Sequence, residues 1–331
     1  DTRKEYFNNL ENLGVEVAKY PFYKSVEQFI KENKNVFTIA LVARVNNAHS
    51  YIDKIRENNS NIKIIFNTID LHHLRNLRES EILQDKKLKK EAEKLKEIEL
   101  DCIKKSDKTI LVSKKEYEYL GSLNINLSSI KILPLLRDQI NKFDINKFNT
   151  RNNSIIFLGN FNHAPNIDAL NFIVDKVWPK LEKECLKNNI KTPALDIIGD
   201  YMPNNLQKKI EKLNCNINIH GFVDNLSNLF SKAKLSLAPL RYGAGLKGKI
   251  ISSYQYGVPV IGTKIAFEGI DLSDIGLNNF VIENPNDYIH LIMEYLDDEQ
   301  VWESNSKNLI NLVNKTYSIQ QNKTIIEDIF Y

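Results

Sequence analysis

The most informative stretch of this sequence is Ala238-Pro-Leu-Arg-Tyr-Gly-Ala-Gly-Leu-Lys-Gly-Lys-Ile-Ile-Ser-Ser-Tyr-Gln-Tyr-Gly-Val-Pro-Val-Ile-Gly-Thr263. An apolar run ends at Pro239, a glycine-rich turn follows, a helix begins near Lys247, and a second apolar run ends at Gly262. Only 12 glycines occur in the chain, and seven of them fall within residues 243–276. Because glycine is used so sparingly, we expect it where the backbone needs a positive φ or a close approach. The stretch is therefore predicted to be a strand–turn–helix–strand unit whose turn has a function.

The turn carries the groups that a phosphorylated ligand requires. Arg241, Lys247 and Lys249 surround the expected helix start, where Gly243 and Gly245 leave backbone amides accessible. Dispersed positive charge and donors that need no reorganisation suit a diphosphate. The two lysines are two residues apart and do not share a helix face, so we expect at most one of them, Lys249, to point into a cleft. The alternative is that both lysines are solvated surface charges.

Outward from this stretch, short apolar runs alternate with helical patterns along the whole chain. Strands are expected at residues 15–18, 37–44, 62–67, 109–112, 130–133, 154–158, 195–198, 217–220, 235–238, 258–262 and 280–282. Helices are expected between them, including residues 74–105, 166–187 and 247–256. Such alternation predicts an α/β protein with parallel sheets covered on both faces.

A polar stretch without periodicity, residues 141–153, separates two such blocks. We therefore predict two Rossmann-like lobes, residues 1–140 and 154–331, with residues 141–153 as the linker and a ligand cleft at the carboxyl ends of the strands. The C-terminal helices are expected to fold back toward the first lobe.

The second lobe opens with Ser154-Ile-Ile-Phe-Leu-Gly159-Asn-Phe-Asn-His-Ala-Pro-Asn166. A strand runs into Gly159, and Asn166 is predicted to cap the following helix. Free amides and a helix N-terminus at this loop favour an anionic ligand. An ordinary strand–turn–helix is the alternative.

In the first block, ionisable residues gather just after the strand that ends at Asn67. They are Asp70, His72, Arg75 and Arg78. We expect one of the neighbouring histidines, His72, to orient or deprotonate a hydroxyl group, and Arg75 to meet an anionic group. A helix-capping aspartate with surface arginines is the alternative.

Several motifs in the second block occur in one order: Phe-Leu-Gly-Asn-Phe-x-His-x-Pro-Asn, Ile-Ile-Gly-Asp, His-Gly-Phe-Val-Asp, Pro-Leu-Arg-x-Gly-Ala-Gly-x-Lys-x-Lys-Ile, Tyr-Gly-Val-Pro-Val-Ile-Gly-Thr and Phe-Glu-Gly-Ile. This order resembles the donor lobe of family-4 type GT-B glycosyltransferases of bacterial type, from about Ser154 onward. The resemblance implies that Arg241 and Lys249 face the diphosphate of a nucleotide sugar. It also implies contacts to the donor sugar or nucleotide from Gly159, Asn160, Phe161, Asn162, Gly199, Phe222, Val223, Ser252 and Glu268.

The sequence departs from that family at one pair of positions. Many relatives carry two glutamates separated by seven residues, and the second of them binds the donor ribose. In this chain the two positions are Ala244 and Ser252. A serine retains one hydrogen bond but removes the bidentate acceptor for the ribose hydroxyls.

The first block also resembles a family, less specifically. The string Asp-Leu-His-x-Leu-Arg-x-x-Arg-Glu from Asp70 is similar to the acceptor lobe of bacterial GT-B enzymes that occur fused to other domains, and Ser113 to Glu116 matches a second site there more loosely. Residues 1–17 resemble the middle of that lobe, so we expect it to lack an opening strand and helix, and the chain to be a piece of a longer polypeptide.

The resemblance implies transfer of a sugar from a nucleoside diphosphate sugar to a saccharide, lipid-linked or protein acceptor, with retention of configuration. No cofactor or metal is expected beyond this co-substrate, because positive side chains stabilise the departing diphosphate. A nucleotide-sugar epimerase of the same fold and a non-catalytic nucleotide-sugar-binding module are the alternatives.

Composition excludes several other classes. The net charge of +3 gives no case for nucleic acid. The three cysteines, Cys102, Cys185 and Cys215, have no metal-ligand spacing and indicate reduced thiols. We expect a cytoplasmic protein; a peripheral position at the inner membrane face is the alternative suggested by the lysine-rich residues 74–105. Interleaved acidic residues favour a solvated helix there.

Overall fold

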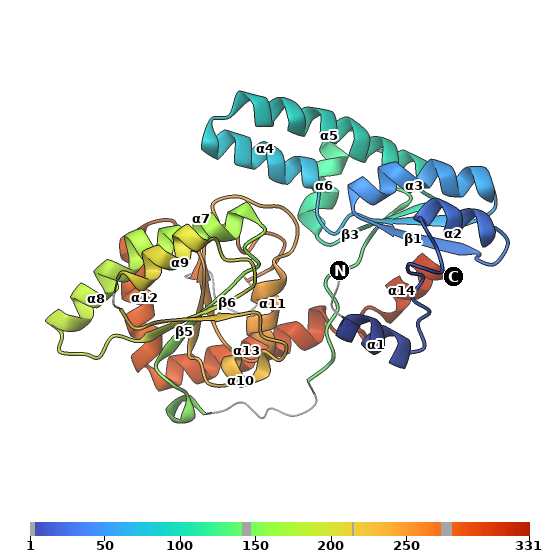
Figure 1. The fold of residues 1–331 in the computed structure, drawn as a ribbon. Helices are drawn as coiled ribbons and strands as arrows, with labels where there is room; N and C mark the ends of the chain where they lie inside the picture. The colour runs from blue at the N-terminus through green and yellow to red at the C-terminus, as the bar shows by residue number, and fades with distance from the viewer. Residues whose placement is uncertain (1–3, 141–146, 214, 273–279) are drawn as a thin grey trace.

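The structure is a computed structural model, and it describes residues 4–140, 147–213, 215–272 and 280–331. It contains two α/β lobes, each built on a parallel sheet (Figure 1). The predicted fold class, two Rossmann-like lobes, is therefore confirmed.

The first sheet has four parallel strands in the order β1-β2-β3-β4. They are β1 (Ile39–Ala43), β2 (Lys63–Asn67), β3 (Lys108–Leu111) and β4 (Ile130–Ile132). The helices of this region are α1 (Lys4–Asn12), α2 (Val26–Glu32), α3 (Val45–Asn58), α4 (His72–Leu83), α5 (Lys86–Lys105) and α6 (Lys114–Ser122). The strand predicted at residues 15–18 is wrong. This segment links α1 to α2 without a strand partner, and Val15 is exposed.

The second sheet has five parallel strands in the order β7-β6-β5-β8-β9. They are β5 (Ser154–Leu158), β6 (Ala194–Ile198), β7 (Ile217–Gly221), β8 (Leu235–Ala238) and β9 (Val260–Gly262). The chain moves outward from β5 through β6 and β7, then returns to the other side of β5 as β8. In open α/β sheets, ligands bind outside the carboxyl ends of the strands where the order reverses. Here that place lies between the loops after β5 and β8.

The helices of the second half are α7 (Ala164–Phe172), a π-helical turn η2 (Ile173–Val177), α8 (Trp178–Lys187), α9 (Asn204–Glu211), α10 (Ser227–Phe230), α11 (Gly248–Gln255), α12 (Pro285–Asp297), α13 (Glu299–Thr316) and α14 (Lys323–Phe330). The helix predicted at residues 166–187 is confirmed: α7, η2 and α8 form one continuous helical run with a π-helical turn in its middle. Within the described residues 280–331, the strand predicted at 280–282 is wrong as well, because a single isolated bridge joins Val281 to Gly262.

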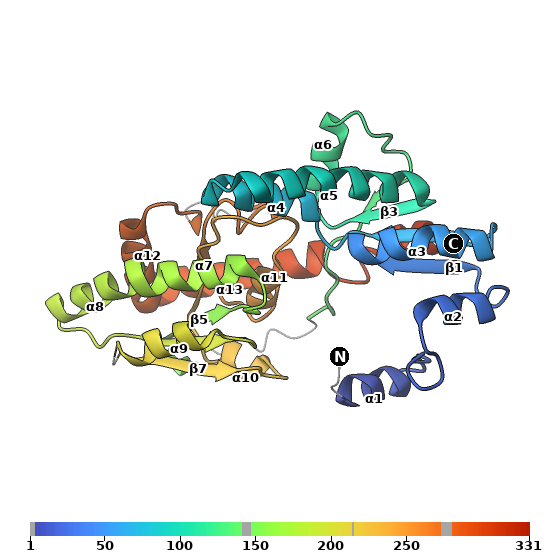
Figure 2. The ribbon, with the colours of Figure 1, turned by 45° about the horizontal axis from the view of Figure 1, so that its top comes forward.

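The long charged helix predicted at residues 74–105 is two helices, α4 and α5. Gln84 ends α4 in the left-handed region with φ of 54°, and the Asp85 side chain accepts hydrogen bonds from the amides of Lys87 and Leu88 at 2.8 and 3.0 Å. An aspartate that caps a new helix explains the break. Both views show α4 and α5 projecting from the first lobe toward the second (Figures 1 and 2).

The described part of the predicted linker and the C-terminal helix pack on different lobes. Of the expected linker, residues 141–146 lie outside the described residues. Its remainder packs on the second lobe, where Phe148 in η1 (Phe148–Thr150) contacts Trp302 and the Arg151 side chain donates to the carbonyls of Phe230 and Ala233. In the other direction, α14 returns to the first lobe as expected (Figure 1). Ile329 is fully buried against Ile65 and Ile110 of the first sheet.

Among the described residues, no helix combines the length and the apolar character needed to cross a membrane.

Candidate functional site

The loops after β5 and β6 touch through their backbones. A Cβ placed on Gly199 would lie 1.8 Å from the Gly159 carbonyl oxygen, and the φ of Gly199 is 152°. The Phe161 amide donates to the Asp200 carbonyl at 3.0 Å, and the Phe161 ring is buried. These contacts fix the loop from Gly159 to Asn162 at the carboxyl edge of the sheet.

Asn166 joins this loop to α11. Its Nδ2 donates to the Asn160 carbonyl at 2.7 Å, and its Oδ1 accepts from Lys249 Nζ at 2.6 Å. The predicted role of Asn166 as helix cap is wrong. The capping position of α7 is His163, since Pro165 fits the first turn of a helix and starts α7 earlier.

The glycine-rich turn lies between the two lobes. Gly245 has φ of 66°, and a Cβ there would lie 2.9 Å from the Asp70 Cβ of the first lobe. A Cβ on Gly269 would lie 2.7 Å from the Ser113 Cβ. Ala244 is buried in the core cluster of the first lobe. The first lobe therefore occupies the space that a glutamate at position 244 would need.

Lys247 and Lys249 lie at the start of α11 and turn to different partners. Lys247 Nζ donates to the Gly245 carbonyl at 2.7 Å and lies 3.6 Å from Glu268 Oε2, whereas Lys249 Nζ reaches Asn166. Burial lowers the pKa of Lys247 to about 8. Burial, with the charge of Lys247, lowers the pKa of Lys249 to about 7. Two amino groups are thus held in desolvated positions at a helix N-terminus, where a nearby anion would favour the charged form of each.

Arg241 lies at the rim of this region. Its Nε donates to Asp168 Oδ2 at 2.8 Å, and its Nη2 contacts the other carboxylate oxygen. The guanidinium is half exposed, and its hydrogen bonds to Asp168 raise the pKa of Arg241.

The charged cluster predicted in the first lobe lies at the start of α4, beside the glycine-rich turn. Arg75 Nη1 donates to Asp70 Oδ2 at 2.7 Å, and His72 Nδ1 lies 3.0 Å from the Asp70 carbonyl oxygen. His73 is instead buried, with Nδ1 2.6 Å from Glu99 Oε2 and Nε2 3.0 Å from the Tyr119 hydroxyl. Of the two histidines, His72 is the more accessible.

Two buried glutamates hold the start of α4 in place. Glu99 accepts from the amides of His72 and His73, both at 3.2 Å, and Glu116 accepts from the Leu71 amide at 2.9 Å. They satisfy the first donors of α4, whose capping residue supplies no side-chain hydrogen bond. Burial raises the pKa of Glu116 to about 7. Glu99 could not be predicted from the sequence, because a glutamate within a long charged helix gives no sign that it is buried.

The remaining predicted residues make other contacts. Ser252 Oγ accepts from Arg137 Nη2 at 3.3 Å, a contact that the sequence did not reveal. Phe222 is exposed, and Val223 packs beside it on a small core cluster.

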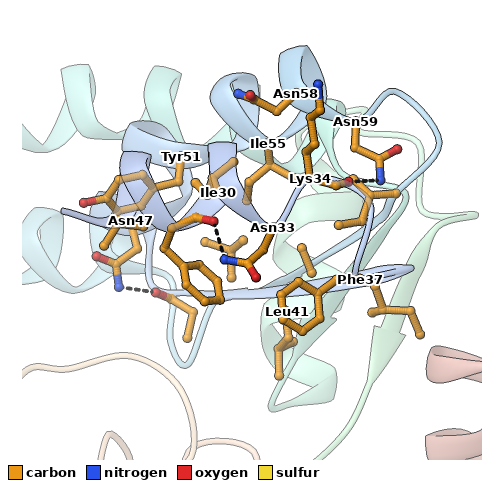
Figure 3. A pocket seen from close by; sticks show the side chains of 17 residues that line it. Ile30, Asn33, Lys34, Phe37, Leu41, Asn47, Tyr51, Ile55, Asn58 and Asn59 are labelled. Carbon is orange, nitrogen blue, oxygen red and sulfur yellow. Dashed lines mark hydrogen bonds between the residues drawn. The ribbon is translucent and has the colours of Figure 1, made fainter. Parts of the chain in front are cut away.

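A cavity of about 560 Å³ lies elsewhere, beside the edge strand β1 (Figure 3). Apolar side chains such as Ile30, Phe37 and Leu41 line it together with Tyr51 and Asn47. None of the predicted site residues does.

The chain is similar to known proteins in sequence over part of its length and in structure over most of it. Residues 152–298 match the family described as glycosyl transferases group 1. No curated protein matches the sequence. Sucrose-phosphate synthase from Thermosynechococcus elongatus has a similar structure, with a TM-score of 0.68 and 13% identity over 96% of this chain and 81% of that one.

Two further structures are similar over most of this chain. HepE from Anabaena, solved with UDP, has a TM-score of 0.70 and 12% identity, covering 98% of this chain and 89% of its own. The pneumococcal O-GlcNAc transferase GtfA, solved with UDP and GlcNAc, has a TM-score of 0.64 and 14% identity, covering 92% of this chain and 59% of its own. The chain therefore has the GT-B glycosyltransferase fold.

Proposed function

We propose that this chain transfers a sugar from a nucleoside diphosphate sugar to a saccharide, lipid-linked or protein acceptor, with retention of configuration and without a metal. The observation that carries the proposal is the pair Lys247 and Lys249 at the N-terminus of α11, each with a pKa lowered by burial. A diphosphate between them would favour the charged form of both lysines and would accept hydrogen bonds from the amides at the start of the helix. HepE with UDP-glucose and GtfA with UDP and GlcNAc support a nucleotide sugar as the ligand.

In this proposal, each group of residues has one task. Lys249, Lys247 and Arg241 stabilise the negative charge that develops on the departing diphosphate. The fixed loop from Gly159 to Asn162, with Gly199, borders the donor sugar, and Phe222 with Val223 borders the base. His72 orients or deprotonates the acceptor hydroxyl. Its ring contacts the Asp70 carbonyl and lies beside the Asp70–Arg75 pair. The family-4 branch of the superfamily is part of the proposal, on the motifs quoted above.

The proposal is tested with a panel of nucleoside diphosphates and nucleotide sugars. A ligand that binds the native state raises the unfolding temperature by mass action, which identifies the base and the sugar. Release of nucleoside diphosphate is then followed with and without acceptor. Transfer requires the acceptor, an epimerase converts the donor without it, and a binding module shows a thermal shift without either reaction. A panel without any thermal shift or turnover would overturn the proposal.

Ser252 gives a second prediction, because Arg137 lies 3.3 Å from its hydroxyl. In Ser252→Glu the new carboxylate is expected to pair with Arg137, leaving the affinity for nucleoside diphosphate nearly unchanged. Ser252→Glu combined with Arg137→Gln frees the carboxylate for the ribose and should tighten binding by about 1–3 kcal/mol.

Isothermal calorimetry on both variants, with Arg137→Gln alone as control, measures this difference. If the double variant binds more weakly than Arg137→Gln, position 252 does not face the ribose, and the pocket is arranged for a different donor.

A further inference from the structure

Arg78 on α4 and Glu268 in the second lobe form a polar contact between the lobes. Arg78 Nη1 lies 2.7 Å from Glu268 Oε2, and Nη2 lies 2.7 Å from Glu268 Oε1. The same Nη1 donates to the Gly243 carbonyl at 2.6 Å. One guanidinium of the first lobe thus holds a carboxylate and the glycine-rich turn of the second.

Arg78 sets the orientation of the Glu268 carboxylate. The carboxylate is mostly buried, with 16% of its side chain exposed, and both oxygens accept from the guanidinium. Burial alone would raise the pKa of Glu268, but the hydrogen bonds from Arg78 and the charge of Lys247 hold this pKa below its ordinary value. Glu268 is therefore an ionised group in a fixed plane, 3.6 Å from Lys247 at the start of α11.

We infer that Arg78 is a positioning residue for donor recognition: it orients Glu268 toward the donor sugar and fixes the Gly243 turn over the diphosphate. The inference rests on the proposed function. A planar guanidinium fixes both carboxylate oxygens at once, whereas an ammonium is a point charge that cannot hold this fork. Donor binding therefore depends on a side chain of the lobe that receives the acceptor.

A purely structural tie between the lobes makes a different prediction. Any cation at position 78 would then keep the lobes together, and its loss would affect donor and acceptor alike. A positioning role demands the fork of arginine and acts on the donor first. Arg78→Lys separates the two roles, because it keeps the charge and loses the planar geometry.

The experiment compares Arg78→Lys, Arg78→Ala and Glu268→Gln in steady-state turnover, varying donor and acceptor separately. Arg56→Lys is the matched control, since Arg56 Nη2 lies 2.7 Å from Asp107 Oδ2 within the first lobe, away from the glycine-rich turn. Thermal unfolding and the radius of gyration from small-angle scattering are measured on each variant.

We expect kcat/KM for the donor to fall about 10-fold in Arg78→Lys and on the order of 100-fold in Arg78→Ala and Glu268→Gln. The acceptor KM and the unfolding temperature of Arg78→Lys should stay close to those of the wild type and of Arg56→Lys. The Glu268→Gln and Arg78→Lys losses should be less than additive when combined, because both act through one contact.

Equal donor kinetics in Arg78→Lys and wild type would overturn the inference and leave the proposed function standing. The same holds if donor and acceptor KM rise together in Arg78→Lys with a larger radius of gyration, which would mark a structural tie. A wild-type chain that binds and turns over no nucleotide sugar would instead overturn the proposed function, and this inference with it.

Discussion

Lys249→Ala should weaken binding of a nucleoside diphosphate by about 1.5–3 kcal/mol, the range for hydrogen bonds to charged groups. Lys249 Nζ is held at the start of α11 by Asn166 and by the face of the Phe157 ring, whose centroid lies 5.0 Å away. The ammonium supports few contacts besides these, so the fold should be kept. Arg241→Ala should cost a similar amount, again without unfolding. Calorimetric titration with the best ligand of the panel measures both losses.

The pH dependence of binding gives a sharper form of this prediction. In the free protein the pKa of Lys249 is about 7, so above neutrality the side chain is mostly uncharged. A bound diphosphate favours the charged form and raises this pKa, so a proton is taken up on binding. Affinity should therefore fall as the pH rises from 7 to 9, by up to about tenfold per unit for each proton taken up.

Lys249→Arg is the matched variant, because a guanidinium stays charged throughout this range. It should bind with one fewer proton taken up than the wild type, and the remaining uptake is assigned to Lys247, whose pKa is about 8. Titration in two buffers of different ionisation enthalpy counts the protons. Unchanged proton uptake in Lys249→Arg, or full affinity in Lys249→Ala and Arg241→Ala, would place the diphosphate elsewhere.

Gly199→Ala should destabilise the second lobe by about 3 kcal/mol or more. The added Cβ would lie 1.8 Å from the Gly159 carbonyl oxygen, and the φ of 152° is one that side chains rarely adopt. Relief requires the β5 and β6 loops to separate, and the loop from Gly159 to Asn162 would move with them. Urea denaturation measures the loss of stability.

Gly221→Ala is the control for this substitution. Gly221 also has a positive φ, of 64°, but a Cβ there meets nothing within 4 Å. It should therefore lose only about 1–2 kcal/mol, the cost of the left-handed conformation. If both variants lose the same amount of stability, backbone strain rather than the contact between Gly159 and Gly199 explains the effect.

The fold could be predicted from the sequence where apolar runs are short and bounded by turn residues. The strands at residues 154–158 and 235–238 were predicted with the bounds that the structure shows, since Gly159 and Pro239 follow them directly. The apolar pattern at residues 15–18 predicts a strand that does not form, because this run has no neighbouring strand to pair with. The pattern also gives no sign of the break at Asp85, because the charged residues continue across it. The capping of α5 by Asp85 is visible only in its hydrogen bonds.

The candidate site could be predicted only in part, for a related reason. Arg241 and Lys249 could be predicted because they lie within or directly after the glycine-rich turn, so the turn itself places them. Contacts between the lobes join residues far apart in the chain: Arg78 and Glu268 are separated by 190 positions. No periodicity or composition connects such residues, and the same holds for Arg137 and Ser252.

The return of α14 to the first lobe has a consequence for how the protein is made. Ile329 covers Ile65 and Ile110, and Asp328 Oδ2 lies 2.7 Å from Lys131 Nζ at the edge of the same sheet. During synthesis the ribosome completes residues 39–132 long before residues 323–330 leave the exit tunnel. The face of the first sheet that α14 covers therefore stays open to water and to chaperones until the second lobe has emerged. The first lobe can be completed only after the ribosome has made the second.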